Sequence, residues 1–185
     1  FLVTGSDDRS IIFYDVTTSP PTIKYHLKRR HNDVVRTVIW HPYLPLFATG
    51  SDDRTVIIYD ISPGFPIVKY YLTDHYDFVN SIAFHADHEL LATVSDDRST
   101  ILYDFSSKIP TIKHRFKHHT GAVLSVSFHQ SLSLLATGSD DKSIIIYNTI
   151  KLSPSIKYHI KNFKFSVNFV VFHTSSPLLA SSSAT

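Results

Sequence analysis

Gly50-Ser-Asp-Asp-Arg-Thr55 is one of four copies of a hexapeptide that recurs along the chain. The other copies begin at Gly5, Val94 and Gly138, and the second Asp of each copy stands at position 8, 53, 97 or 141, at steps of 45, 44 and 44 residues. A period held this closely indicates one supersecondary unit repeated several times, and such units become stable by stacking on their neighbours. The repeat therefore predicts the fold class.

Each copy contains four short apolar runs separated by turn-forming residues. In the first complete copy these runs are Val34–Trp40, Leu46–Thr49, Thr55–Tyr59 and Ile67–Leu72. Short runs rich in Val, Ile, Phe and Tyr and bounded by Pro, Gly, Ser and Asp predict strands. Several runs are apolar almost throughout, which favours strands covered on both faces. We expect an all-β fold, a β-propeller of four-stranded antiparallel blades, in which each blade lies between two others.

The copies also predict the boundaries of the blades. We expect complete repeats at 31–74, 75–118 and 119–162, a partial blade at 1–30 and another at 163–185. The first and last expected strands each belong to an incomplete blade, and the sequence contains no Met. Closed propellers have typically four to eight blades. Either the terminal pieces combine to close a small ring or, as we expect, this region of about four blades is part of a larger propeller of seven or eight blades.

Composition excludes several classes of function. The chain has 185 residues, of which 43% are hydrophobic, and no apolar run reaches the roughly 18 residues of a membrane span. Cys is absent, which excludes disulfides and thiolate metal sites and favours a cytoplasmic or nuclear location. Neither a phosphate-binding glycine loop nor a nucleophile elbow is present. The sequence therefore predicts a protein without cofactor, metal or catalytic residues.

A longer pattern runs through each copy, from a His to a Tyr-Asp pair. In the first complete copy it comprises His31, Val35, Val38, Trp40, Thr49-Gly-Ser-x-Asp53 and Tyr59-Asp60. This order and spacing resemble the WD-repeat (beta-transducin) family of β-propellers, and the resemblance covers the whole chain. The departures are Tyr in place of Trp in every copy, and Val94, Asn148 and Phe163 in place of a Gly, an Asp and a His.

The resemblance implies a hydrogen-bonded chain inside each blade, made by a His, a Thr, the turn Asp and the terminal aromatic residue. The matching residues are His31, Thr49, Asp53 and Tyr59; His75, Thr93, Asp97 and Tyr103; and His119, Thr137, Asp141 and Tyr147. Ser51 and its counterparts compete with Thr49 and its counterparts for the hydroxyl position. Because Asp, His and Thr recur together in every copy, we interpret them as fold residues and not as a catalytic triad.

A second His series, His41, His85, His129 and His173, follows the first strand of each copy. A zinc site needs nitrogens that converge on one point about 2 Å away, whereas equivalent positions on separate blades lie apart. We therefore interpret these residues as turn histidines.

The family resemblance also implies a partner-binding face. Its members use the positions three and five residues after the His and the one before the turn Asp. These positions are Val34, Arg36 and Asp52; Phe78, Asn80 and Asp96; Ala122, Leu124 and Asp140; and, in the partial copies, Ser166, Asn168 and Asp7. Apolar centres within an acidic ring suit a protein or peptide that carries basic residues. In the alternative interpretation, the Asp residues only favour their own turns.

Basic residues gather in the fourth run of each copy and include Lys24, Lys69, Lys113 and Lys157. On an outermost strand, lysines prevent edge-to-edge pairing. They could also bind nucleic acid or another acidic polymer, although the net charge is only +2. The leading prediction is a non-enzymatic scaffold that binds other proteins as a subunit of a multiprotein complex, and acidic-polymer binding is the alternative.

Overall fold

A computed structural model describes residues 1–86, 89–129, 131–149 and 154–183 of the chain. Seventeen strands occur in these ranges, and none of the described residues is helical. No helix that could cross a membrane occurs among them. The chain forms two compact units, 1–79 and 80–185.

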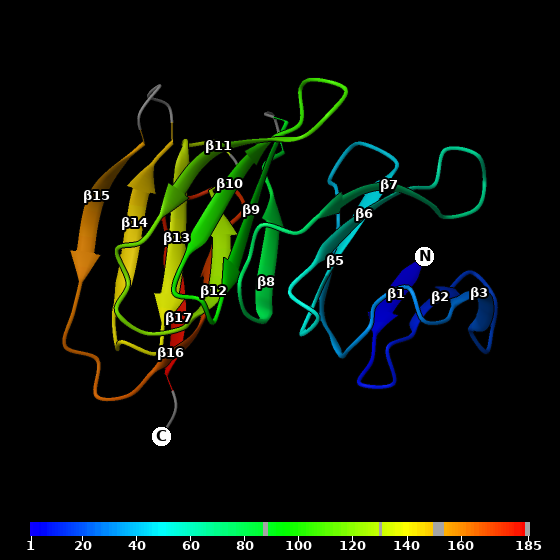
Figure 1. The fold of residues 1–185 in the computed structure, drawn as a ribbon, viewed down its shortest axis with the longest axis horizontal. Helices are drawn as coiled ribbons and strands as arrows, with labels where there is room; N and C mark the ends of the chain where they lie inside the picture. Colours follow the sequence, from blue (N-terminus) through cyan, green and yellow to red (C-terminus); the bar gives the residue numbers. More distant parts are fainter. Residues whose placement is uncertain (87–88, 130, 150–153, 184–185) are drawn as a thin grey trace. The chain divides into compact units, whose positions relative to one another are not determined.

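The first unit contains two antiparallel sheets whose strands follow chain order (Figure 1). The three-stranded sheet consists of β1 (Leu2–Gly5), β2 (Ile11–Asp15) and β3 (Thr22–Leu27). The four-stranded sheet consists of β4 (Val35–Trp40), β5 (Leu46–Ser51), β6 (Val56–Asp60) and β7 (Ile67–Leu72). The four-stranded sheet coincides with the repeat expected at 31–74.

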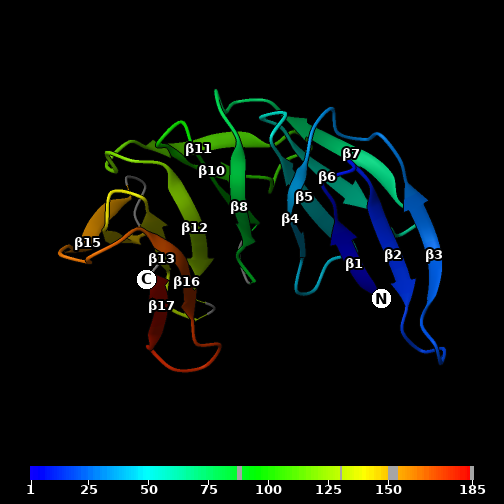
Figure 2. The ribbon, with the colours of Figure 1, turned by 90° about the horizontal axis from the view of Figure 1, so that it is seen from below.

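The second unit contains two four-stranded sheets and one pair of strands. The first sheet consists of β8 (Val79–Phe84), β9 (Leu90–Ser95), β10 (Thr100–Asp104) and β11 (Thr111–Phe116). The second consists of β12 (Val123–Phe128), β13 (Leu134–Ser139), β14 (Ile144–Asn148) and β15 (Ser155–Ile160). The pair is β16 (Val167–Phe172) and β17 (Leu179–Ser183), and β16 lies beside β12 (Figure 2). The predicted all-β fold of four-stranded antiparallel blades is confirmed.

The middle strands of each sheet form the core. Every residue of β5 and β9 is buried, and only the last residue of β6, β10 and β14 is partly exposed. In the first unit, Phe47 contacts Phe13 of the preceding sheet, with ring centroids 4.9 Å apart. This packing between sheets explains why these strands are apolar on both faces.

The hexapeptide forms the turn between the second and third strands of each blade. The Arg54 N–H donates to the Ser51 carbonyl at 3.1 Å, and the Ser51 N–H donates to the Thr55 carbonyl at 3.2 Å. Arg54 has a φ of 71°, in the left-handed region that a turn of this length requires before the next strand. The basic residue of each other copy has the same backbone conformation: Arg9, Arg98 and Lys142.

Two β-bulges recur in the blades. In the outermost strand the ladder skips one residue, and this residue is the Lys of the repeat: Lys24, Lys69, Lys113 and Lys157. In the first strand the ladder skips the residue five positions after the His: Arg36, Leu124 and, in the last pair of strands, Asn168. A bulged residue is released from ladder pairing, and the bulge changes the direction of its side chain.

Candidate functional site

The polar network of the repeat 31–74 connects the loop before β4 to the β5–β6 turn. The His31 side chain is 1% exposed, and its Nδ1 lies 3.0 Å from Asp53 Oδ2. Since a carboxylate only accepts, Nδ1 carries a proton, and Nε2 lies 2.7 Å from Thr49 Oγ1. Burial alone would raise the pKa of Asp53, but the hydrogen bonds from His31 and Thr55 outweigh burial and hold this pKa far below its ordinary value.

The repeat 119–162 contains the same geometry. His119 Nδ1 lies 2.9 Å from Asp141 Oδ2, and its Nε2 lies 2.8 Å from Thr137 Oγ1. Burial lowers the pKa of His119, although Asp141 acts in the opposite direction. The imidazole is therefore held in its neutral form, with Nε2 free to accept from the threonine.

In the repeat 75–118, three of the four network residues are likewise buried: His75, Thr93 and Tyr103. The fourth, Asp97, accepts from the Ser99 N–H at 2.8 Å and from Ser99 Oγ at 2.6 Å. His75, Thr93 and Tyr103 are therefore buried like their counterparts in the other two complete repeats.

A further hydroxyl belongs to each network. Thr55 Oγ1 donates to Asp53 at 2.6 Å and lies 3.1 Å from His31 Nδ1. Ser143 takes the same place beside Asp141, at 2.6 Å. Our interpretation of the sequence missed this position, although every hexapeptide ends in a hydroxyl residue, which is the signal that could have shown it.

Ser51 has a separate role from Thr49. Its Oγ donates to the Asp33 carbonyl at 3.1 Å and accepts from the Asp53 N–H at 3.1 Å. Ser51 thus fixes the loop before β4 against the turn, while Thr49 contacts the imidazole.

On the predicted partner-binding face of the first unit, the Arg36 guanidinium lies between the Asp52 carboxylate and the Phe78 ring. The Arg36 guanidinium forms a two-pronged ion pair with Asp52, in which Nε bonds one carboxylate oxygen and an η nitrogen bonds the other at 2.9 Å. The same guanidinium lies 5.4 Å from the centre of the Phe78 ring. Val34 is half-buried beside this pair, and its carbonyl accepts from the Asp52 N–H at 3.0 Å.

The second unit contains two further groups of these residues. Asn80 Nδ2 donates to Asp96 Oδ1 at 2.6 Å and to the Val123 carbonyl at 3.0 Å. The exposed Asp140 accepts from Ser166 Oγ, and its N–H donates to the Ala122 carbonyl at 2.9 Å.

The remaining residues of the predicted face differ in exposure. Leu124 is half-buried, whereas Asn168 and Asp7 are exposed. Each Asp that precedes a turn Asp in the complete repeats therefore has a hydrogen-bond donor within its own unit. Arg36 neutralises the charge of Asp52, whereas Asp96 and Asp140 accept from the uncharged side chains of Asn80 and Ser166.

Comparison with protein-family models gives three matches to "WD domain, G-beta repeat", at residues 22–60, 67–104 and 110–148. The chain belongs to the WD-repeat family. Each matched segment starts at or near an outermost strand and ends at the Tyr-Asp or Tyr-Asn pair. A comparison with curated proteins gave no match. WD repeats generally mediate contacts between proteins and are typically not enzymes.

The tyrosine that replaces the Trp of the WD pair does not close the network in two repeats. Tyr59 and Tyr147 are fully buried, and their hydroxyl oxygens have no hydrogen-bond partner among the described residues. Burial raises the pKa of Tyr59 far more than the nearby Thr49 hydroxyl lowers it. We had expected the polar tip of this side chain to complete the hydrogen-bonded chain, and the structure departs from that expectation. The Tyr59 ring instead stacks on the Phe47 ring, with the two ring centroids 4.4 Å apart.

We therefore expect the substitution Tyr59→Phe to raise the free energy of unfolding of this WD-repeat chain by up to about 1 kcal/mol, because it removes a buried hydroxyl without a partner. Urea unfolding followed by circular dichroism measures the change. Tyr14→Phe, at the matching and partly exposed position of the first repeat, should have no effect. A loss of about 1 kcal/mol in Tyr59→Phe would show that the hydroxyl is hydrogen-bonded.

The second His series closes the turn after the first strand of the WD repeats. His41 Nδ1 accepts from the Tyr43 and Leu44 N–H groups, at 3.2 and 3.0 Å. His129 and His173 make the corresponding pairs of bonds in their own turns. Among the described residues, no group of three or more His, Cys, Asp or Glu could hold a metal ion.

Two of the bulged lysines of the outermost strands pair with the last residue of the WD motif. Lys69 Nζ lies 3.4 Å from Asp60 Oδ2, and Lys113 Nζ lies 3.7 Å from Asp104 Oδ2. These ion pairs reduce the positive charge available to an acidic polymer. Asn148 stands at the same place in the repeat 119–162, so Lys157 faces no carboxylate at this position.

Proposed function

We propose that this WD-repeat chain is a non-enzymatic scaffold whose binding face is formed by the first strands of the blades and the hexapeptide turns. The recurrent bulge in the first strand supports this proposal most directly. It occurs at Arg36, Leu124 and Asn168, and bulges are frequent where a side chain is directed toward a binding partner.

The chemistry of these positions fits a protein partner. Apolar side chains at Val34, Phe78 and Leu124 are half-buried, so they retain surface that a partner could cover. The Asp140 carboxylate is exposed and suits a basic residue at the margin of the interface. The Asp, His and Thr residues that could suggest catalysis are used inside the blades instead.

Selection of peptides from a random displayed library, followed by affinity measurements on the purified chain, tests the proposal. Leu124→Asp should weaken the selected peptides by about tenfold or more, since it places a charge on an apolar contact. Ile109→Asp is the matched control, because Ile109 is an exposed apolar residue of a loop outside the face, and it should change affinity little.

Three results would contradict the proposal. The first is an equal loss of affinity in both variants, and the second is a failure to select any peptide. The third is binding that depends on Lys69 and Lys113 but not on Leu124, with a steep loss of affinity at high salt, which would favour an acidic polymer.

A further inference from the structure

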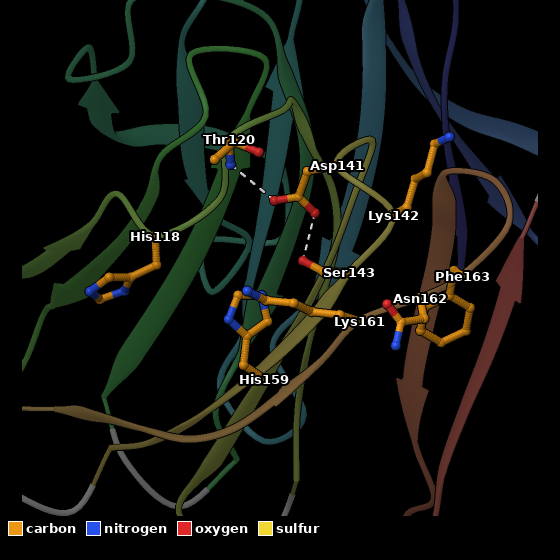
Figure 3. A pocket seen from close by; sticks show the side chains of 9 residues that line it. All are labelled: His118, Thr120, Asp141, Lys142, Ser143, His159, Lys161, Asn162 and Phe163. Carbon is orange, nitrogen blue, oxygen red and sulfur yellow. Dashed lines mark hydrogen bonds between the residues drawn. The ribbon is translucent and has the colours of Figure 1, made fainter.

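The repeat 119–162 contains a basic pocket that the proposed scaffold function does not use. The pocket has a volume of about 470 Å³. It is formed where the loop before β12, the β13–β14 turn and the end of β15 meet. Its lining includes His118, His159, Lys161, Asn162 and Phe163 (Figure 3).

Positive charge dominates this pocket. The lining contains Lys142 and Lys161 and one carboxylate, that of Asp141, so its formal charge is +1 with both histidines neutral. Lys161 extends toward the His159 ring, whereas the Lys142 side chain points away from it (Figure 3).

The one carboxylate is already used within the blade. Asp141 accepts from His119, from Ser143 at 2.6 Å and from the Thr120 N–H at 2.9 Å. These bonds leave the His159 and Lys161 nitrogens available for a ligand rather than for Asp141.

One departure from the WD-repeat pattern lies in this pocket. Phe163 replaces the His that begins every complete repeat, and it supplies an apolar wall.

We propose that this pocket binds a phosphate monoester carried on a protein side chain, as in phosphoserine or phosphothreonine. His159 and Lys161, whose side chains lie together in Figure 3, would each donate to a phosphate oxygen, and His118 lines the same pocket apart from them and adds a third nitrogen. The volume exceeds that of the phosphate alone and leaves room for the group that carries it, against the Phe163 ring.

Titration of the ¹⁵N-labelled chain with N-acetyl-O-phosphoserine N-methylamide tests the proposal. Saturable shifts are expected at the backbone amides of 159–163 and in the imidazoles of His118 and His159. The double variant His159→Gln/Lys161→Gln should bind about tenfold or more weakly, because it removes two charge-assisted hydrogen bonds.

The first repeat offers a matched control. His26 faces Ile12 across the ladder as His159 faces Ile145, and Lys28 stands two residues later, as Lys161 does. His26→Gln/Lys28→Gln removes the same charges from an exposed strand end and should leave the affinity unchanged. An equal loss in both double variants would show that the ligand responds to overall charge, and the proposal would be wrong.

The pH dependence gives an independent readout. Burial and the neighbouring Lys161 lower the pKa of His159, and His118 acts in the same direction, while Asp141 opposes them. A bound dianion would raise this pKa, so binding takes up a proton. Sulfate, which keeps both charges over this range, should bind several-fold more tightly at pH 6 than at pH 8, and His159→Gln should reduce that difference.

A membrane source of phosphate is the remaining alternative. Vesicles of phosphatidylcholine with a few per cent of a phosphatidylinositol phosphate should not bind the chain more than plain phosphatidylcholine vesicles do. Binding to the phosphoinositide vesicles without any shift from the phosphoserine amide would overturn the assignment to a phosphorylated protein.

Discussion

Replacing Asp53 by Ala is expected to lower the free energy of unfolding by about 3 kcal/mol, because the substitution leaves buried donors without their acceptor. Asp53 accepts from the His31 ring, from the Asn32 N–H at 2.8 Å and from Thr55. Its side chain is 8% exposed, so water cannot easily replace the lost bonds. Chemical unfolding of the 185-residue chain, monitored by circular dichroism, measures the change.

Asp8→Ala provides the control for this prediction. Asp8 occupies the same place in the hexapeptide turn and accepts from the Ser10 N–H at 2.9 Å, but it is exposed. Its loss should change stability little. If Asp53→Ala and Asp8→Ala were equally mild, the turn and not the buried network would account for the repeated Asp.

Replacing Phe47 by Ala is expected to cost about 4 kcal/mol, as large-to-small substitutions of fully buried aromatic residues commonly do. The Phe47 ring is fully buried, stacks on Tyr59 and meets the edge of Phe13, which lies in the preceding sheet. The cavity would therefore open between two sheets, where neither can collapse without moving the other. A thermal or urea unfolding curve gives the loss.

Tyr43→Ala is the comparison for Phe47→Ala, because Tyr43 is 75% exposed in a loop of the same repeat. It should change the free energy of unfolding by less than about 0.5 kcal/mol. A loss for Phe47→Ala below about 1 kcal/mol would contradict the tight packing between these two sheets.

The periodic features of the fold could be predicted from the sequence, since each depends on local pattern. Apolar runs at the same place in each copy located the strands within one or two residues. The side-chain partners depend on geometry that periodicity does not contain. Thr49 and Ser51 are two residues apart on one strand, so their side chains point to the same face, and only the structure assigns the imidazole to one and the loop carbonyl to the other.

The side-chain contacts of the candidate binding face could not be predicted from the sequence either. The resemblance to WD repeats assigned Arg36 and Asp52 to one face, but it did not predict that the two side chains contact each other. The two residues are 16 positions apart, and they meet because a bulge interrupts the β4–β5 ladder at Arg36. A bulge adds one residue without altering the apolar pattern enough to be recognised, so the ion pair between Arg36 and Asp52 could not be predicted.

The bulge at the outermost strand determines where the length of a blade can change. Without Lys69, Val68 and Tyr70 would pair consecutively with Tyr59 and Ile58, and the ladder pairs on both sides would keep their partners. A one-residue deletion in β5 or β6 would instead turn buried side chains toward the opposite face. The repeat can therefore vary by one residue at its lysine without losing its core, whereas the two middle strands must keep their lengths.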